Sequence, residues 1–340
     1  MSKVITFGEI MLRLSTERFL RFSQASNFQA TYGGGEFNVA VALANFGLDS
    51  AFVTRIPNND IGACALQEMH KKQVGTEHVV VEGDRLGIYF LETGAGTRSS
   101  KVVYDRANSA MATITDDTFD WEEIFKDAKW FHWSGITPAI SQSAAQVCLL
   151  AVKAAHKRGI PISTDLNYRS KLWQYGKQPH EVMPELLQYS TIILGDLDTA
   201  NFMLGKPKLN PDYELTKALP EGYKQVFSAC KNLKYMATTL RYSVGASHQR
   251  IGGILYDGET LYRGQVKDVT PVVDRVGSGD AFMGGLIYGL IQSANDHQKV
   301  IDTAVACCCL KHTIFGDYNL ITLNDVEQFL SGDLSAKVSR

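Results

Sequence analysis

The sequence lacks several features that define whole classes of protein. Its 340 residues carry a formal net charge of −2, so there is no basic excess to attract nucleic acid or an anionic membrane surface. No apolar run is long enough to span a bilayer. The N-terminus enters an apolar segment almost at once, which leaves no room for a signal peptide. We therefore expect no nucleic-acid partner, no membrane partner and a cytoplasmic location.

Cysteine is scarce and its spacing is uninformative for metal binding. The six cysteines contain no Cys-x-x-Cys pair. Three of them, Cys307, Cys308 and Cys309, are consecutive within an apolar helical stretch. Such a run is typical of small buried side chains with reduced thiols rather than of disulfides or metal ligands.

Two common nucleotide-binding motifs are also missing. The opening strand is followed by Gly8-Glu9-Ile10-Met11, not by the Gly-x-Gly-x-x-Gly fingerprint, which argues against a NAD-dependent oxidoreductase. The glycines near residue 278 are not followed by Gly-Lys-Ser/Thr, so they form no Walker A loop.

The chain does contain a regular alternation of strand and helix patterns. Strands are predicted at residues 4–7, 51–55, 161–165, 191–194 and 235–240, helices at 38–46, 61–73 and 142–158, and a hairpin at 253–256 and 259–262. This alternation predicts βαβ units and a largely parallel sheet covered on both faces. Ligands of such sheets gather at the C-terminal ends of the strands. A hydrophobic share of 45% is ample for a sizeable core.

A small-residue loop near the C-terminus has the composition of an anion site. Gly277, Ser278 and Gly279 would let backbone N–H groups converge on a phosphate at the start of an apolar helix. Asp280 follows in the first turn, where a general base would be needed for phosphoryl transfer to a hydroxyl. The same residues also fit a tight turn followed by a helix N-cap.

A second glycine turn lies far upstream. Gly33, Gly34 and Gly35 run into a small-residue helix, and Asn38 projects one turn into it. Alone, this segment is better explained as a loop followed by a tightly packed helix than as a ligand-binding site.

Together the two segments resemble the signatures of the ribokinase-like (PfkB-type) sugar kinases, a Gly-Gly-rich N-terminal segment and Asp-x-x-Gly-x-Gly-Asp from Asp274 to Asp280. The resemblance covers nearly the whole chain. It implies an α/β fold, a three-layer αβα sandwich with a mostly parallel central sheet and a small β-sheet lid. The core would comprise residues 1–11, 33–85 and 105–340, and the lid residues 12–32 and 86–104. The lid would cover the sugar and form a homodimer contact.

Within the family the chain is most similar to 2-keto-3-deoxygluconate kinases, through the segments Asp165–Arg169, Leu172-Trp173 and Tyr104–Ala110. That resemblance implies transfer of a phosphate from ATP to the 6-hydroxyl of a sugar acid. It implies substrate contacts from Gly34, Asn38, Tyr89, Tyr104, Arg106, Asn167, Arg169 and Asp274. Arg106 and Arg169 are the candidates for the carboxylate, because a guanidinium matches two oxygens, although isolated arginines are commonly solvated surface residues.

The resemblance also places the cofactors. ATP would lie along Thr239, Arg241, Gly277, Gly279, Ala306, Cys309 and His312, with Arg241 standing where the family commonly has glycine. The family's Asn-x-x-Glu motif is altered, because Asp196 replaces the Asn and Thr199 the Glu, with Asp198 adjacent. Mg²⁺ would then be held by these carboxylates through water. The position of Asp274 also allows a monovalent cation such as K⁺.

Two alternatives remain open at this point. One is another PfkB-type activity, on fructose, ribose, the keto-deoxy-galactonate epimer or a nucleoside. The other is a non-catalytic relative that binds a sugar or nucleotide.

Overall fold

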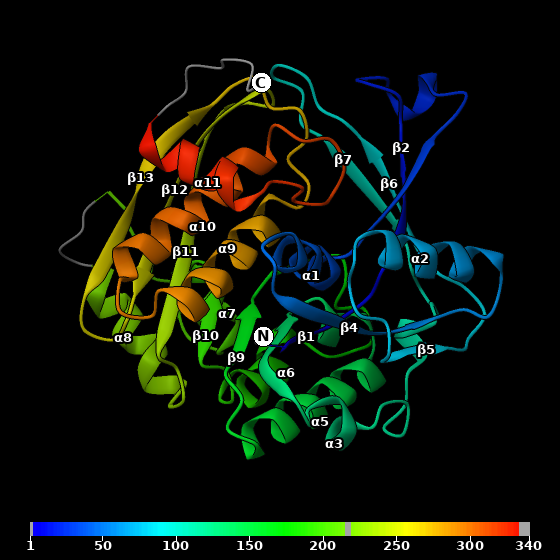
Figure 1. Ribbon diagram of the computed structural model, residues 1–340, viewed down its shortest axis with the longest axis horizontal. Helices are drawn as coiled ribbons and strands as arrows, with labels where there is room; N and C mark the ends of the chain where they lie inside the picture. The colour runs from blue at the N-terminus through cyan, green and yellow to red at the C-terminus, as the bar shows by residue number, and fades with distance from the viewer. Residues whose placement is uncertain (1–2, 215–218, 333–340) are drawn as a thin grey trace.

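The computed structural model describes residues 3–214 and 219–332 and centres on a nine-stranded sheet (Figure 1). Its strands are β1 (Lys3–Phe7), β4 (Asp49–Ile56), β5 (Val79–Val81), β8 (Ala128–Ser134), β9 (Ile162–Asp165), β10 (Ile192–Leu194), β11 (Tyr235–Gly245), β12 (His248–Tyr256) and β13 (Leu261–Val269). Their order across the sheet is β13-β12-β11-β10-β9-β8-β1-β4-β5. Every pairing is parallel except those of β12 with β11 and β13.

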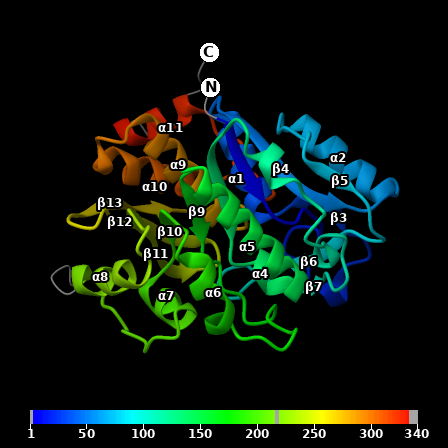
Figure 2. The same ribbon diagram turned by 90° about the horizontal axis from the view of Figure 1, so that it is seen from below.

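Helices cover both faces of this sheet, as Figure 2 shows. One face carries α1 (Gly35–Asn45), α2 (Asp60–Lys71), α9 (Ser278–Gln292), α10 (His297–Lys311) and α11 (Leu323–Ser331). The other carries α4 (Thr137–Ile140), α5 (Gln142–Lys157), α6 (Pro179–Leu187), α7 (Leu197–Met203) and α8 (Leu219–Ala229), with α3 (Trp121–Ile124) packed against α5. Two short 3₁₀ turns complete the set, η1 (Phe22–Gln24) and η2 (Met111–Thr113).

The core is divided between the two faces because the central strands are buried on both sides. In β1, Ile5 packs with Val147 and Ala151 of α5, while Val4 packs with residues of α9 and α10. This explains why residues 4–7 of β1 are all buried instead of alternating between buried and exposed. The C-terminal ends of β1, β9 and β10 therefore emerge together at one edge of a rigid sheet, where a site can form.

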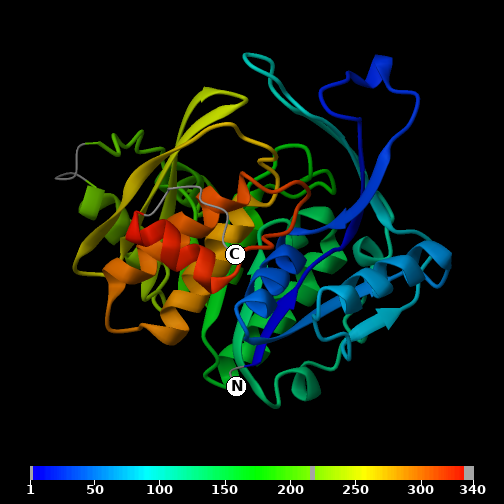
Figure 3. The ribbon, with the colours of Figure 1, turned by 45° about the horizontal axis from the view of Figure 1, so that its top comes forward.

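A separate four-stranded sheet rises from the body (Figures 1 and 3). It consists of β2 (Met11–Ser15), β3 (Gln29–Gly33), β6 (Gly87–Glu92) and β7 (Lys101–Asp105), in the order β3-β2-β6-β7. The loop between β6 and β7 contacts the turn between β11 and β12, where Ala246 N donates to Gly96 O at 2.7 Å. We call this sheet the lid. Its strands lie in or at the ends of the two predicted lid segments.

The predicted fold class is confirmed, and the main elements lie where the periodicity placed them. The predicted helix 38–46 begins earlier, at Gly35, and the predicted strand 235–240 continues to Gly245. Of the six cysteines, all free, five are buried and Cys64 is exposed. None of the helices in the described ranges is long and apolar enough to cross a membrane. The predicted ranges 1–11 and 105–340 include residues 1–2, 215–218 and 333–340, which lie outside the described residues.

Candidate active site

The anion loop sits at the N-terminus of α9, as the sequence predicts. Gly277 is the N-cap and has a left-handed φ of 78°. A Cβ at this position would lie 1.8 Å from the carbonyl oxygen of Asp317, so only glycine fits. By contrast, a Cβ at Gly279 would meet nothing within 4 Å. The loop is thus packed from behind and open in front, with the helix N-terminus facing the open side.

Asp280 lies in the first turn of α9, and its carboxylate is held by a residue from the other signature. Asn38 Nδ2 donates to Asp280 Oδ2 at 2.6 Å. Burial raises the pKa of Asp280 to about 7, and the nearby carboxylate of Asp165 adds to that rise, while the Asn38 hydrogen bond opposes it. A pKa near neutrality suits a general base, because the group can both exist as carboxylate and accept a proton.

A cavity of about 400 Å³ opens in front of Asp280 and the anion loop. It gathers most of the sequence-predicted residues from both halves of the chain, namely Gly34, Asn38, Tyr89, Tyr104, Asn167, Arg169, Arg241, Gly277, Ser278, Gly279 and Asp280. The lid forms its roof, with Ser99, Ser100 and Val102 beside Tyr104. One wall of the cavity is therefore rich in hydroxyl and aromatic groups, and the anion loop and the carboxylate of Asp280 lie in the same cavity.

Three arginines bring positive charge to this cavity, which the carboxylates of Asp165, Asp280 and Asp317 also line. Arg169, Arg241 and Arg275 all line it. Arg241 donates to Ser278 Oγ at 2.9 Å, which places it beside the anion loop. Burial lowers the pKa of Arg275, and the positive charges of Arg241 and Arg169 lower it further, as expected of like charges in one site. The arrangement can neutralise phosphates and a carboxylate together.

A second cavity of about 240 Å³ adjoins the first on the side of β10 and β11. The two share Asp165, Asn167, Arg241 and Gly279. Thr239 lines this second cavity, as predicted for the nucleotide side, together with Asp196 and Thr199. A nucleotide lying here would present its phosphates to the anion loop.

The two carboxylates predicted to bind the metal, those of Asp196 and Asp198, lie in different surroundings. Asp196 caps α7, accepting from Thr199 N at 2.8 Å and from its hydroxyl at 2.7 Å, and it remains exposed at the second cavity. Asp198 points elsewhere and accepts from the backbone N atoms of Leu209 and Asn210. In the described part of the chain, His, Cys, Asp and Glu nowhere form a group of three or more able to hold a metal. Asp196 thus fits a water-mediated Mg²⁺ contact and Asp198 does not.

Six predicted residues line neither cavity, namely Asp198, described above, and five others. Arg106 is buried and forms an ion pair with Glu9 behind the lid. Asp274 is buried and bonded to Arg13 at 2.6 Å. The remaining three, Ala306, Cys309 and His312, belong to the interior around α10, where His312 Nδ1 contacts Cys308 O at 2.7 Å.

The sequence reasoning missed a buried ionic cluster behind the anion loop. Arg13 of β2 is fully buried and donates to Asp274 at 2.6 Å and to Asp317 at 2.7 Å. Tyr89 of β6 also donates to Asp317, at 2.5 Å. The cluster ties the lid to the loop that carries Gly277. No periodicity identifies it, because a lone arginine in a strand is normally solvated.

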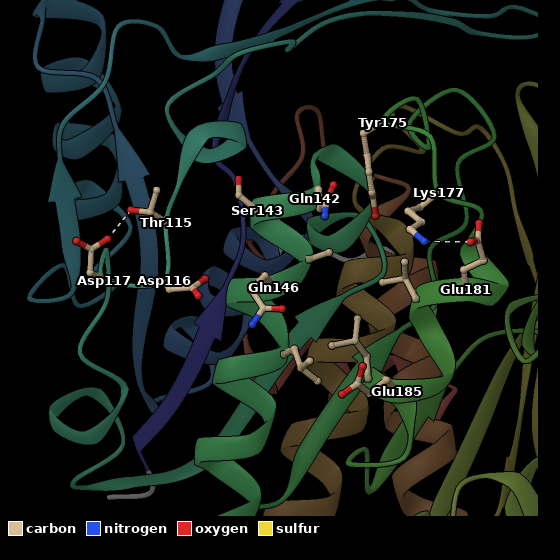
Figure 4. A pocket seen from close by; sticks show the side chains of 14 residues that line it. Thr115, Asp116, Asp117, Gln142, Ser143, Gln146, Tyr175, Lys177, Glu181 and Glu185 are labelled. Atoms are coloured by element: carbon tan, nitrogen blue, oxygen red, sulfur yellow. Dashed lines mark hydrogen bonds and ion pairs between the residues drawn. The ribbon is translucent and has the colours of Figure 1, made fainter.

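A larger cavity of about 830 Å³ lies between α5, α6 and residues 115–117 (Figure 4). Two pairs of its polar groups bond to each other, Lys177 with Glu181 at 3.2 Å and Thr115 with Asp117 at 2.6 Å. It contains neither a glycine loop nor an arginine. We therefore take the smaller cavity beside Asp280 as the candidate active site.

Comparison with known proteins agrees with this geometry. The profile of the pfkB family carbohydrate kinases matches residues 1–230. The crystal structure of a 2-dehydro-3-deoxygluconokinase from Thermotoga maritima superposes with a TM-score of 0.92 at 39% identity, covering 98% of this chain and 100% of that one. A 2-dehydro-3-deoxygalactonokinase from Haloferax volcanii is 29% identical, and a 2-dehydro-3-deoxygluconokinase from Bacillus subtilis 26%. These alignments cover 97% of both chains for the former, and 96% of this chain and 95% of the relative for the latter. The chain therefore belongs to the pfkB family of carbohydrate kinases, the ATP-dependent sugar kinases.

Proposed function

We propose that this kinase transfers the γ-phosphate of ATP to the 6-hydroxyl of 2-keto-3-deoxygluconate. The proposal rests mainly on the position of Arg169 and on its lack of a partner in the described part of the chain. Its guanidinium lines the cavity that contains Asp280 and has no hydrogen-bond or ion-pair partner within residues 3–214 and 219–332. A cation left free beside a base and a hydroxyl-binding wall fits a sugar that also carries a carboxylate. The names of the relatives point to the same class of substrate.

The proposed chemistry uses groups already in position. Asp280 accepts the proton of the substrate hydroxyl, whose oxygen forms the new bond to the γ-phosphorus as the bond to the ADP oxygen breaks. The N–H groups of the 277–279 loop and the side chain of Arg241 stabilise charge on the transferred group. Asn38 orients the base. Asp196 would hold Mg²⁺ through water, and that ion would neutralise the β- and γ-phosphates.

The two arginines predicted for the carboxylate receive different roles in this proposal. Arg169 makes the direct contact. Arg106, paired with Glu9 and lying 5.8 Å from the ring centroid of Tyr104, supports that tyrosine in the wall of the cavity. Gly34 and Asn167 complete the sugar side, and Asp274 supports the loop from behind.

The galacto epimer is the second candidate substrate. The relative from Haloferax volcanii is a 2-dehydro-3-deoxygalactonokinase, with 29% identity over 338 residues. The two sugars differ only in stereochemistry, so both present a carboxylate to Arg169, and the hydroxyl-binding wall would have to separate them.

An ADP-release assay with Mg·ATP tests the proposal. The panel contains 2-keto-3-deoxygluconate, its galacto epimer, fructose, ribose and adenosine. We expect turnover on the keto-deoxy acids, and a decrease of about 10²–10⁴-fold in Asp280→Asn because a positioned base is lost. Arg169→Ala should raise KM for the acids about tenfold or more, the effect of losing one charged hydrogen bond. Arg250→Ala, an exposed arginine of β12 outside the cavity, is the matched control. Turnover on a neutral sugar alone would refute the substrate assignment.

We also propose a homodimer through the lid. Phe28 and Val103 are 40% and 51% exposed, and they lie beside β3 and on β7. Exposed apolar side chains on a small sheet favour burial against a second copy. Sedimentation equilibrium of Val103→Glu against the unmodified protein tests this, and a monomeric parent chain would contradict it.

A further inference from the structure

The interior behind the anion loop contains a lysine that the chemistry above does not use. Lys311, the last residue of α10, is fully buried. Its ammonium donates to the carbonyl oxygen of Asp274 at 3.2 Å and to that of Ile314 at 3.0 Å. These two carbonyls belong to different loops, one leading into the anion loop and one following α10. Backbone carbonyls that converge on one point are the ligands by which proteins bind dehydrated K⁺.

The lysine already places a positive charge beside these carbonyls. Arg13 is bonded to the carboxylates of Asp274 and Asp317, at 2.6 and 2.7 Å. The same two carboxylates and, more weakly, that of Asp280 also act on Lys311. A metal cation beside the same carbonyls would stand next to the Lys311 ammonium in a desolvated place, where two like charges are costly to bring together. The residues present thus do not fit the monovalent cation that the position of Asp274 allows.

The lysine also determines where the anion loop lies. Asp274 precedes Gly277 by three residues, and Gly277 packs against the carbonyl of Asp317. The backbone of the two loops is further joined where Val273 N donates to His312 O at 2.8 Å. An ammonium held by both loops therefore fixes the distance between them, as a bound ion would.

We infer that the Lys311 ammonium takes the place of a monovalent cation, so that this kinase needs neither K⁺ nor another such ion for activity. Lys311 is a positioning residue. It touches neither cavity and acts through the backbone of Asp274. The inference rests on kinase activity alone, and it is tested with whichever sugar is turned over, so failure of the substrate assignment leaves it unaffected.

The test measures turnover in buffers whose only monovalent cation is tetramethylammonium, with KCl, NH₄Cl, NaCl or LiCl added at constant ionic strength. The rate of the unmodified kinase should vary by no more than about twofold across the series, because a constant ionic strength keeps general salt effects the same. Lys311→Met, similar in shape but uncharged, should lose about 10²-fold through misplacement of the loop. K⁺ or NH₄⁺ should restore that rate. Lys299→Met, exposed on the same helix, is the control.

Thermal unfolding supplies a second readout that does not depend on turnover. K⁺ should raise the melting temperature of Lys311→Met, because an ion that binds only the folded state stabilises it, and should leave that of the unmodified chain unchanged. Specific activation of the unmodified kinase by K⁺ over Na⁺ would overturn the inference. So would full activity of Lys311→Met without added ions, or a folded variant that no ion restores. Should the variant not fold, the ion series on the unmodified kinase decides.

Discussion

The hydrogen bond from Asn38 lowers the pKa of Asp280, the proposed base, against the larger effect of burial, so its removal should shift the pH profile in a known direction. The bond is 2.6 Å long and favours the carboxylate, opposing the burial that raises the pKa of Asp280 to about 7. A hydrogen bond to a charged group contributes about 1.5–3 kcal/mol, and 1.36 kcal/mol corresponds to about one pKa unit. In Asn38→Ala the pKa of Asp280 should therefore rise by about one to two units.

The sign of the effect on rate follows from the role of the base. Only the ionised carboxylate accepts a proton, so the rate falls as pH drops through the pKa of Asp280. With the pKa raised, the ionised fraction at pH 7 falls from about one half to between about one tenth and one hundredth. The acidic limb of kcat/KM should move from about pH 7 to about pH 8–9, and the rate should recover above it.

The assay is ADP release between pH 5.5 and 10, with kcat/KM determined at each pH because that ratio reports the free enzyme. Asn45→Ala is the control. Asn45 lies on the same helix but donates to Asn319 O, away from the cavity. An acidic limb that stays in place, or moves to lower pH, would refute the electrostatic role of Asn38. An equal loss of kcat/KM at every pH would show that Asn38 orients Asp280 without changing its pKa.

Two further predictions concern the cluster and the loop behind the site. Arg13→Met removes the ion-pair partner of the buried carboxylates of Asp274 and Asp317 and should lower the free energy of unfolding by about 3–5 kcal/mol in urea titrations. Lys153→Met, which breaks a surface pair, should cost less than about 1 kcal/mol, and equal effects would contradict the buried role of Arg13. Gly277→Ala should lower kcat by about 10²-fold or more, because its Cβ would displace the N–H donors of the loop. Gly47→Ala has the same φ of 78° with nothing within 4 Å, and its kcat should be unchanged.

The sequence predicted the fold, and it singled out the residues at the centre of the candidate site, because both depend on local pattern. Strand and helix periodicity locates the sheet, and a glycine loop before Asp280 is recognisable wherever the chain places it. The pairing of charged side chains is different, because it depends on which loops meet in space. Nothing near Arg106 in the sequence indicates that Glu9 neutralises its charge. Likewise, nothing near Asp198 indicates that the backbone N–H groups of residues 209 and 210 donate to its carboxylate.

Lys311 and Arg13 illustrate the same limit for buried charge. Each stands in a segment whose pattern predicts only an ordinary helix or strand, and a lysine at a helix C-terminus is a common solvated residue. Their burial follows from the meeting of the 274–277 and 312–317 loops beneath the lid, which no spacing in the sequence encodes.

The ion pair between Arg13 and Asp317 joins residues 304 positions apart. During synthesis Arg13 emerges 261 residues before Asp274 and 304 residues before Asp317, so β2 has no partner for its charge until the chain has been made past residue 274. Burying an unpaired guanidinium is costly, so the lid cannot settle onto the body of a nascent chain. Chains that stop before residue 274 should remain open at the lid and be preferred substrates for proteases.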